Sequence, residues 1–329
     1  MSFLPARNLL QAPGAVVMIR PHAFVPNPET QSDNAFQTRP DDGGDRLSAR
    51  ARDEHDAAVA VLRGHGITVH VFDDDGSRNT PDSVFPNNWF STHPGGQIAI
   101  YPMYAASRRR ERRADVIEML KCRYRVQDVI DMSGLEEDGL ALEGTGAMVL
   151  DHIGRVAYTV RSNRADPVAL ERFCTHFAYE PIAFDAVDAA GRAVYHTNVL
   201  MCIASDFALA GLVMIPDRPR RDVIARRLAE TGRTVIPLTE AQIGEFAGNA
   251  IELTGDKGRI LALSRRAARA LDAAQIREIE RSAQIVPLDV PTIEHAGGSV
   301  RCMIAGVHLS PRPAPAANTP DTNPAGDDK

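Results

Sequence analysis

The sequence lacks the patterns that mark several common classes of protein. Its four cysteines, Cys122, Cys174, Cys202 and Cys302, form no C-x-x-C pair, so neither a zinc site nor a disulfide scaffold is indicated. No apolar run approaches the roughly 20 residues that span a bilayer, and the N-terminal segment lacks the continuous apolar region of a signal peptide. P-loop, H-E-x-x-H and G-x-S-x-G motifs are also absent. We therefore expect a soluble, cytoplasmic protein that does not interact with membranes.

The composition is that of an ordinary globular protein. Of the 329 residues, 44% are hydrophobic and 24% are charged, which is enough apolar bulk for a large core. The 37 Lys and Arg against 43 Asp and Glu give a net charge of −6, which disfavours nucleic-acid binding. Ser310 to Lys329 is Pro-rich with almost no apolar bulk and is expected to be a disordered tail. The polar stretch from Pro26 to Asp45 is expected to be a long exposed loop, a type of segment that often forms a lid.

Helix-like and strand-like segments alternate along the rest of the chain. Five segments have the apolar spacing of amphipathic helices, namely Leu47–Arg63, Ser107–Lys121, Pro167–Phe177, Arg218–Glu230 and Ser264–Ser282. Each is followed by a β-like run, namely ITVHVF from Ile67, YRVQDVI from Tyr124, EPIAF from Glu180, TVIPL from Thr234 and QIVPL from Gln284. The clearest hairpins turn at His152–Gly154, Ala204–Asp206 and Gly255–Gly258.

The order strand, strand, helix, strand recurs about five times, and a period near 50 residues indicates radial repetition around an axis. The last strand signal, CMIAGVHL, has no hairpin partner before the tail. The segment AVVMIR, at Ala15 to Arg20, can supply that partner and close the ring. We therefore predict a single α/β domain over residues 1–309, followed by the tail over 310–329.

The loops after the five post-helix strands are predicted to lie at one end of the ring; they contain SVFPNNWF, GLALEGTG, AVYHTNV, EFAGNAIE and EHAGGSVRC. Cys302 is the candidate nucleophile because Gly297 and Gly298 let the backbone approach a ligand closely. The alternative is a small buried hydrophobe at the start of a strand. On spacing alone this alternative stays open.

A cysteine nucleophile needs a neighbouring base, and a leaving amine needs a proton. His196 lies in an equivalent loop and His295 lies near Cys302 in sequence, so both are candidates for this role. Glu143 follows the apolar LAL and is a candidate carboxylate that binds substrate N–H groups or orients an imidazolium. Each of these residues could also have no chemical role, and only their combination favours one.

Other signals are assigned no catalytic role. Cys122, Cys174 and Cys202 are expected in the core. The clusters RRRERR at Arg108–Arg113 and DEHD at Asp53–Asp56 are expected to be solvated helix faces.

In this order, the motifs FPNN, LEGTG, YHTNV and GGSVRCM resemble those of the amidinotransferase and deiminase superfamily. That superfamily has the pentein fold, a five-bladed ββαβ propeller with pseudo-fivefold symmetry, and the resemblance is greatest to its citrulline-utilising hydrolases. The resemblance covers essentially everything before the tail. It implies that Cys302 is the nucleophile, His196 the general acid and base, and Glu143 the carboxylate that binds substrate and orients the site.

Two departures from this resemblance bear on the substrate. Arginine-processing members usually have Asp where this chain has Asn88 and Asn198. A guanidinium is permanently charged and favours carboxylates, whereas a neutral ureido group has both donors and an acceptor, which an amide can match. The two amides, together with Asn87, are therefore candidate substrate-binding residues for a ureido amino acid such as citrulline.

The expected reaction is attack by Cys302 on the ureido carbon, loss of ornithine, and hydrolysis of the carbamoyl thioester to ammonia and carbon dioxide. It requires no metal and no organic cofactor. Arg20 and Arg301 are candidates to bind the substrate carboxylate, or else form structural ion pairs.

Three other functional hypotheses stay open: a guanidino deiminase or dimethylarginine-type hydrolase, an amidinotransferase, and a non-catalytic pentein binding module. The sequence does not fix the oligomeric state, and a homodimer stays open. The only partner it indicates is a small amino-acid substrate.

Overall fold

A computed structural model describes residues 11–38, 40 and 43–313 of the chain. The strands of this part form five separate three-stranded sheets. In every sheet the middle strand pairs antiparallel with one neighbour and parallel with the other, and the parallel pair is joined through helices. The strands are β1 (Ala15–Arg20), β2 (Thr68–Asp73), β3 (Phe90–His93), β4 (Gln97–Ile100), β5 (Asp128–Asp131), β6 (Met148–Asp151), β7 (Val156–Val160), β8 (Glu180–Phe184), β9 (Met201–Ile203), β10 (Phe207–Ala210), β11 (Thr234–Pro237), β12 (Ile251–Gly255), β13 (Gly258–Ser264), β14 (Gln284–Leu288) and β15 (Ala305–Gly306).

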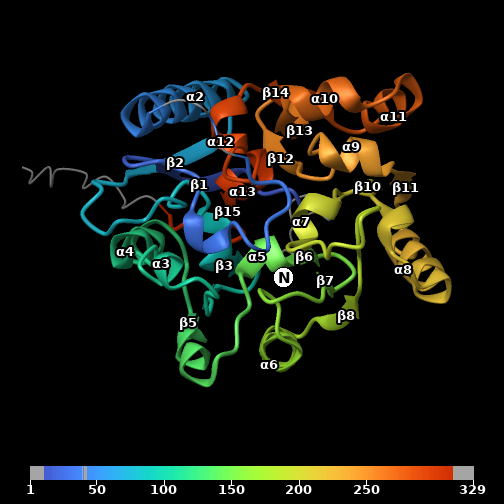
Figure 1. The fold of residues 1–329 in the computed structure, drawn as a ribbon, viewed down its shortest axis with the longest axis horizontal. Coiled ribbons are helices and arrows are strands. Elements are labelled where there is room, and N and C mark those ends of the chain that lie inside the picture. Colours follow the sequence, from blue (N-terminus) through green and yellow to red (C-terminus); the bar gives the residue numbers. More distant parts are fainter. Residues whose placement is uncertain (1–10, 39, 41–42, 314–329) are drawn as a thin grey trace, which may run out of the picture.

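The predicted five-bladed α/β arrangement is confirmed. The sheets follow one another around a common centre, and the longer helices lie on the outside (Figure 1). The ring is closed as the sequence predicts, since β1 pairs antiparallel with β15 through Val16 with Gly306 and Val17 with Ala305. The two ends of the described chain therefore share one sheet.

The α-helices that join the parallel strand pairs form an outer set, and the remaining helical elements, most of them short, form a second set. The outer helices are α2 (Gly44–Gly64), α3 (Ala106–Arg109), α4 (Ala114–Arg123), α6 (Pro167–Phe177), α8 (Arg218–Ala229), α10 (Arg265–Ala270) and α11 (Ala273–Ile279). The second set contains η1 (Pro28–Thr30), η2 (Pro86–Asn88), η3 (Ser133–Asp138), α5 (Gly144–Ala147), α7 (Thr197–Leu200), η4 (Leu212–Met214), α9 (Glu240–Gly244), α12 (Pro291–Glu294) and α13 (Val300–Met303). Of these, η2, α5, α7 and α13 each come shortly before the first strand of a blade or the closing strand β15.

Local sequence explains where α6 begins and ends. The Asp166 side chain accepts hydrogen bonds from the backbone N–H groups of Val168 and Ala169, and Pro167 occupies the first turn, where its missing N–H is harmless. The helix ends at Ala178 in a left-handed conformation. These signals place α6 over the residues that the sequence predicts.

Two predicted helices are each split in the structure. The segment predicted from Ser264 to Ser282 breaks at Leu271, because Asp272 caps a new helix through a capping box with Gln275. The segment predicted from Ser107 to Lys121 breaks between α3 and α4.

The burial of two residues differs from what the sequence predicts. Arg108, expected in a solvated face, is buried and forms a bidentate ion pair with buried Glu111. Cys122, expected in the core, is exposed. Cys174 and Cys202 are buried, as predicted.

The predicted tail is ordered over its first residues. The carbonyl of Ser310 accepts a hydrogen bond from the backbone of Arg125, and the backbone of Arg312 donates to Arg123. The expectation of disorder is therefore wrong for these residues next to α4, and residues 314–329 lie outside the described part of the chain.

Candidate active site

The short elements before the first strands and before β15 bring Glu143, His196 and Cys302 to one place. Glu143 and His196 are the residues immediately before α5 and α7, and Cys302 lies within α13. These positions are equivalent in their blades, and for this reason residues far apart in sequence meet near the centre of the ring. Close packing requires glycine here, since a Cβ at Gly146 would lie 2.1 Å from the side-chain amide of Asn88 and 2.8 Å from His196 Nδ1.

Cys302 and His196 line one cavity of about 20 Å³. Its other polar or charged lining residues are Thr30, Asn34, Asp82, Asn88, Arg108, Arg164 and Tyr195, and Phe85, Ala296 and Gly298 complete the wall. A cavity of this size holds about one water molecule. A larger molecule can therefore enter only if part of the wall moves.

Glu143 and His196 form a buried pair beside this cavity. His196 Nε2 lies 2.9 Å from Glu143 Oε2, and Glu143 is completely buried. Burial alone would raise the pKa of Glu143, but the charges of Arg164 and Arg108 and the hydrogen bond with His196 outweigh it and hold this pKa below its ordinary range. Glu143 is therefore an ionised acceptor.

The ionised carboxylate fixes the state of the imidazole. Burial lowers the pKa of His196 to about 4, against the opposing effect of Glu143, so the ring is neutral at pH 7. Since Glu143 can only accept, the single ring proton is on Nε2, and Nδ1 of His196 carries a free lone pair. A neutral imidazole with a free lone pair can accept a proton.

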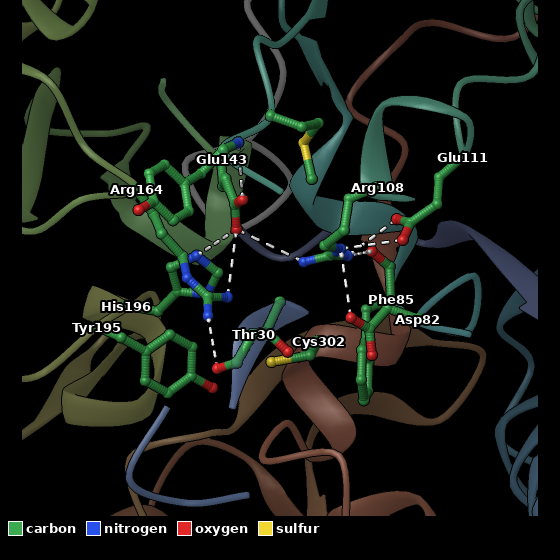
Figure 2. Close-up of polar contacts among 12 residues, drawn as sticks. Thr30, Asp82, Phe85, Arg108, Glu111, Glu143, Arg164, Tyr195, His196 and Cys302 are labelled. Carbon is green, nitrogen blue, oxygen red and sulfur yellow. Dashed lines mark hydrogen bonds and ion pairs between the residues drawn. The ribbon is translucent and has the colours of Figure 1, made fainter. Parts of the chain in front are cut away.

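Two arginines hold the Glu143 carboxylate from the other sides. Arg108 Nη1 lies 3.5 Å and Arg164 Nη1 lies 3.6 Å from Glu143 Oε2. Figure 2 shows the carboxylate between Arg164, His196 and Arg108, with Cys302 on the opposite side of the group. Each guanidinium also pairs with a second acid, Arg108 with Glu111 and Arg164 with Asp33.

The sulfur of Cys302 is contacted by two side-chain amides. Asn198 Nδ2 lies 3.2 Å and Asn249 Nδ2 lies 3.3 Å from Cys302 Sγ. The Oδ1 atom of Asn198 is buried and accepts no hydrogen bond from any residue the structure describes. A buried acceptor without a hydrogen-bond donor lowers the stability of the fold unless a ligand or water donates to it.

The asparagine pair of η2 lies at the other wall. Asn88 lines the cavity, and its amide is oriented with Oδ1 2.7 Å from Arg108 Nη1 and Nδ2 3.2 Å from Asn87 Oδ1. This orientation follows because a guanidinium has only donors. The carbonyl of Asn87 accepts a hydrogen bond from Thr145 at 3.1 Å, and this bond ties η2 to α5.

The loop predicted over Pro26–Asp45 covers this cavity in its described part. Thr30 and Asn34 line the wall, and Asn34 Nδ2 donates to the carbonyl of Ala296 at 3.2 Å. Asp33 accepts two hydrogen bonds from Arg164. The loop therefore touches the same arginine that holds Glu143.

Two predicted carboxylate-binding residues lie elsewhere. Arg20 is paired with Asp56 at 2.8 Å and with Asp73 at 3.7 Å on the outer side of β1. Arg301 points to a second cavity formed by the first strands of the blades and donates to the carbonyl of Ile304. Neither side chain lines the cavity of Cys302, so the structure does not bring these two predicted residues to it.

The alternative base, His295, also lies outside the cavity. Its Nδ1 is 2.6 Å from Thr38 Oγ1, and it lines a separate surface groove. Sequence reasoning missed Arg108 and Arg164 as site residues. Asn249 lay in a loop that was singled out, but nothing in its type indicated a role.

Over the described ranges, no helix is long and apolar enough to cross a membrane. In the same ranges, no group of three or more His, Cys, Asp or Glu side chains could hold a metal ion.

Comparison with known proteins gives one family and a set of similar folds. The family model described as "N,N dimethylarginine dimethylhydrolase, eukaryotic" matches residues 20–309. A search of the curated proteins found no significant match.

Several solved structures resemble the chain. The N-terminal domain of ArgZ, an arginine dihydrolase from the ornithine–ammonia cycle in cyanobacteria, gives a TM-score of 0.66 at 15% identity, covering 90% of this chain and 99% of that one. AgrE with ornithine and NAD⁺ gives 0.67 at 18% identity, covering 91% of this chain and 40% of that longer one. A dimethylarginine dimethylaminohydrolase adduct gives 0.59 at 14% identity, covering 88% and 98%. At these identities the three structures show that the fold is shared.

Proposed function

Because the chain belongs to the family described as N,N dimethylarginine dimethylhydrolase, eukaryotic, we propose that it is a cysteine-dependent hydrolase of a ureido or guanidino amino acid, with citrulline as its substrate. The catalytic domain in this proposal is residues 1–309. The main support for the proposal is that Cys302 and His196 line one cavity and that His196 is hydrogen-bonded to Glu143. A non-catalytic binding module gives no reason for these three side chains to meet.

The ion pairs around the cavity favour a neutral reacting group. Arg108 and Arg164 line the cavity, and each nearby acid already pairs with one or both of them, namely Asp33, Asp82, Glu111 and Glu143. A guanidinium substrate would have to compete with these two guanidiniums for a carboxylate, whereas a ureido group brings no charge. The orphan Oδ1 of Asn198 suits the terminal NH₂ of a ureido group.

The reaction begins with transfer of the Cys302 proton to the free lone pair of His196, and the resulting imidazolium is stabilised by Glu143. The thiolate attacks the ureido carbon and forms a tetrahedral oxyanion, which needs a hydrogen-bond donor such as an Asn amide or a backbone N–H. His196 then gives its proton to the δ-nitrogen, the C–N bond breaks, and ornithine leaves. The carbamoyl group remains on Cys302 as a thioester.

A water molecule deprotonated by His196 then attacks the thioester. This step releases the Cys302 thiol and carbamate, which breaks down to ammonia and carbon dioxide. The sum is citrulline plus water giving ornithine, ammonia and carbon dioxide. These steps need no metal and no organic cofactor.

Access to the cavity assigns a role to the described part of the loop over Pro26–Asp45, which leads into α2 at Gly44. A space for about one water cannot admit an amino acid, and Thr30 and Asn34 form part of its wall. We assign this loop as a lid that opens for substrate and then excludes water from the thioester until the amine has left.

One guanidino alternative has its own support. The family description names dimethylarginine, and the Asn198 Oδ1 acceptor could equally take a guanidinium N–H. The test is incubation with citrulline, arginine, agmatine and dimethylarginine, with Cys302→Ser as the blank. Ornithine from citrulline supports the ureido assignment, and citrulline from arginine or from dimethylarginine would overturn it. Turnover of none of the four by folded protein would favour the binding module.

A further inference from the structure

Asn249 lies just before β12, in the segment of its blade that precedes the first strand, as Glu143 and His196 do in their blades. Its side chain is completely buried and makes three contacts. Nδ2 donates to Cys302 Sγ at 3.3 Å and to the carbonyl of Asn198 at 3.0 Å, and Oδ1 accepts from the backbone N–H of Arg301 at 3.0 Å. All the hydrogen-bonding atoms of this amide are therefore engaged.

These contacts allow only one orientation of the amide. The backbone N–H of Arg301 can only donate and the carbonyl of Asn198 can only accept, so Oδ1 must face the first and Nδ2 the second. The remaining N–H of Asn249 then points at the sulfur. The segment cannot relax easily, because a Cβ at neighbouring Gly248 would lie 2.5 Å from the carbonyl of Val199.

We propose that Asn249 is a catalytic residue whose amide N–H stabilises the thiolate of Cys302 once the proton has moved to His196. This inference rests on the proposed role of Cys302 as the nucleophile. A thiolate is a much stronger acceptor than a thiol, so an N–H held against the sulfur favours the ionised form. Asn198 and Asn249 together form a two-amide cradle for the sulfur.

The side-chain amides of Asn198 and Asn249 have different roles. Asn198 contacts the sulfur through Nδ2 and keeps its Oδ1 without a partner among the described residues, so it can serve sulfur and substrate at once. Asn249 has no such spare atom for a substrate, since its other contacts are to the backbone of Asn198 and Arg301. Loss of Asn249 should therefore slow the chemistry without weakening substrate binding.

Other charged and titratable groups surround the sulfur. His196 and Tyr195 share the cavity with it, and Arg301 lies beside it on the side of the second cavity. Arg108, Arg164 and Asp82 lie across the cavity, with Glu143 behind His196. Asn249 contacts none of these side chains and meets Arg301 only at its backbone N–H, so a change in the reactivity of the sulfur can be assigned to the amide.

The test measures alkylation of Cys302 by iodoacetamide against pH, in a Cys122→Ser background because Cys122 is exposed. In Asn249→Ala, alkylation at pH 7 should be roughly tenfold slower, and its pH profile should move to higher pH. Asn249→Asp should be slower still, because a carboxylate repels the thiolate. Asn249→Ser, which restores a donor, should recover part of the rate. Gln275→Ala, which removes a buried amide from another part of the fold, should leave the profile unchanged.

An unchanged profile in Asn249→Ala and Asn249→Asp, with both proteins folded by circular dichroism, would overturn the inference. If Asn249→Ala does not fold, identical alkylation profiles in Asn249→Ser and Asn249→Asp would overturn the inference instead. Alkylation needs no substrate, so failure to cleave citrulline would refute the proposed substrate and leave the role of Asn249 to this measurement. Where citrulline is cleaved, Asn249→Ala should lower kcat with KM little changed.

Discussion

His196 Nε2 lies 2.9 Å from Glu143 Oε2, and neither side chain is more than 2% exposed. The pair carries one negative charge, on the Glu143 carboxylate, and Arg108 and Arg164 stabilise it. Its resting state is therefore a carboxylate and a neutral imidazole, ready to accept a proton and to stabilise the cation that results.

Glu143→Gln should lower kcat by roughly 100-fold or more, because the amide keeps the shape but no longer stabilises an imidazolium. Steady-state kinetics on the substrate identified by the panel provides the measurement. Glu136→Gln serves as the matched control, since Glu136 pairs with Arg112 outside the cavity. More than half of the wild-type kcat in Glu143→Gln would contradict the assigned role.

Asn88→Asp should shift preference from citrulline toward arginine by roughly tenfold in the ratio of kcat/KM values. The new carboxylate stays next to Arg108, and Asn87 Nδ2, which has no partner among the described residues, can turn to donate to it. The change adds one negative charge where a guanidinium would bind. An unaltered ratio would show that the charge at residue 88 does not select the substrate.

Gly297→Ala should disturb the proposed lid. Gly297 has a φ of +80°, and an added Cβ would lie 2.4 Å from the Asn34 amide. Limited proteolysis should cut residues 26–45 faster, and kcat/KM should fall. Gly191→Ala is the matched control, since its φ of +77° carries the same backbone cost, about 1 kcal/mol, with no atom near the added Cβ.

In the wild-type protein, bound substrate should slow the same proteolytic cuts. Equal cleavage of the 26–45 segment with and without substrate would remove the evidence for a lid.

Acid should destabilise the protein through buried histidines. Burial holds the pKa of His93 well below its ordinary value, and His93 Nδ1 has no partner among the described residues. The unfolded chain binds a proton as the pH falls below about 6.5 while the folded ring stays neutral, so stability is full above that pH and is lost below it. His152 and His196 act in the same direction.

His93→Phe should therefore reduce the difference in unfolding free energy between pH 7 and pH 5 by about 2 kcal/mol. Urea unfolding at the two pH values measures it. His176→Gln, at an exposed position of α6, should leave the difference unchanged. The same pH difference in His93→Phe as in the wild type would contradict this origin of the acid sensitivity.

Periodicity predicted the fold well because each blade repeats the same order of elements. The helix over Pro167–Phe177 was predicted to the residue, since a cap and a proline mark its start. The break at Leu271 was missed because an apolar periodic pattern continues through it, although Asp272 carries a capping signal. The exposure of Cys122 depends on which face of α4 packs inward, and its residue type gave the wrong answer.

The candidate site was predictable only where equivalent loop positions carry chemically informative residue types. Cys302, His196 and Glu143 met this condition. Arg164 did not, because its burial depends on partners distant in sequence, Asp33 and Glu143, which spacing cannot reveal. Arg20 is the opposite case, since its residue type suggested a site role but an acid on α2, Asp56, pairs with it at the surface.

The pairing of β1 with β15 also has a consequence for biosynthesis. Cys302 precedes β15 by only a few residues, and β15 completes the sheet that begins with β1. A ribosome must therefore make almost the whole described chain before the thiol exists, and the last strand added joins one of the first. Glu143 and His196 are made long before the sulfur, so a nascent or prematurely ended chain has the proposed base without the proposed nucleophile. In the proposed mechanism, catalytic competence and completion of the ring arrive together, and activity reports a chain in which β15 has joined β1.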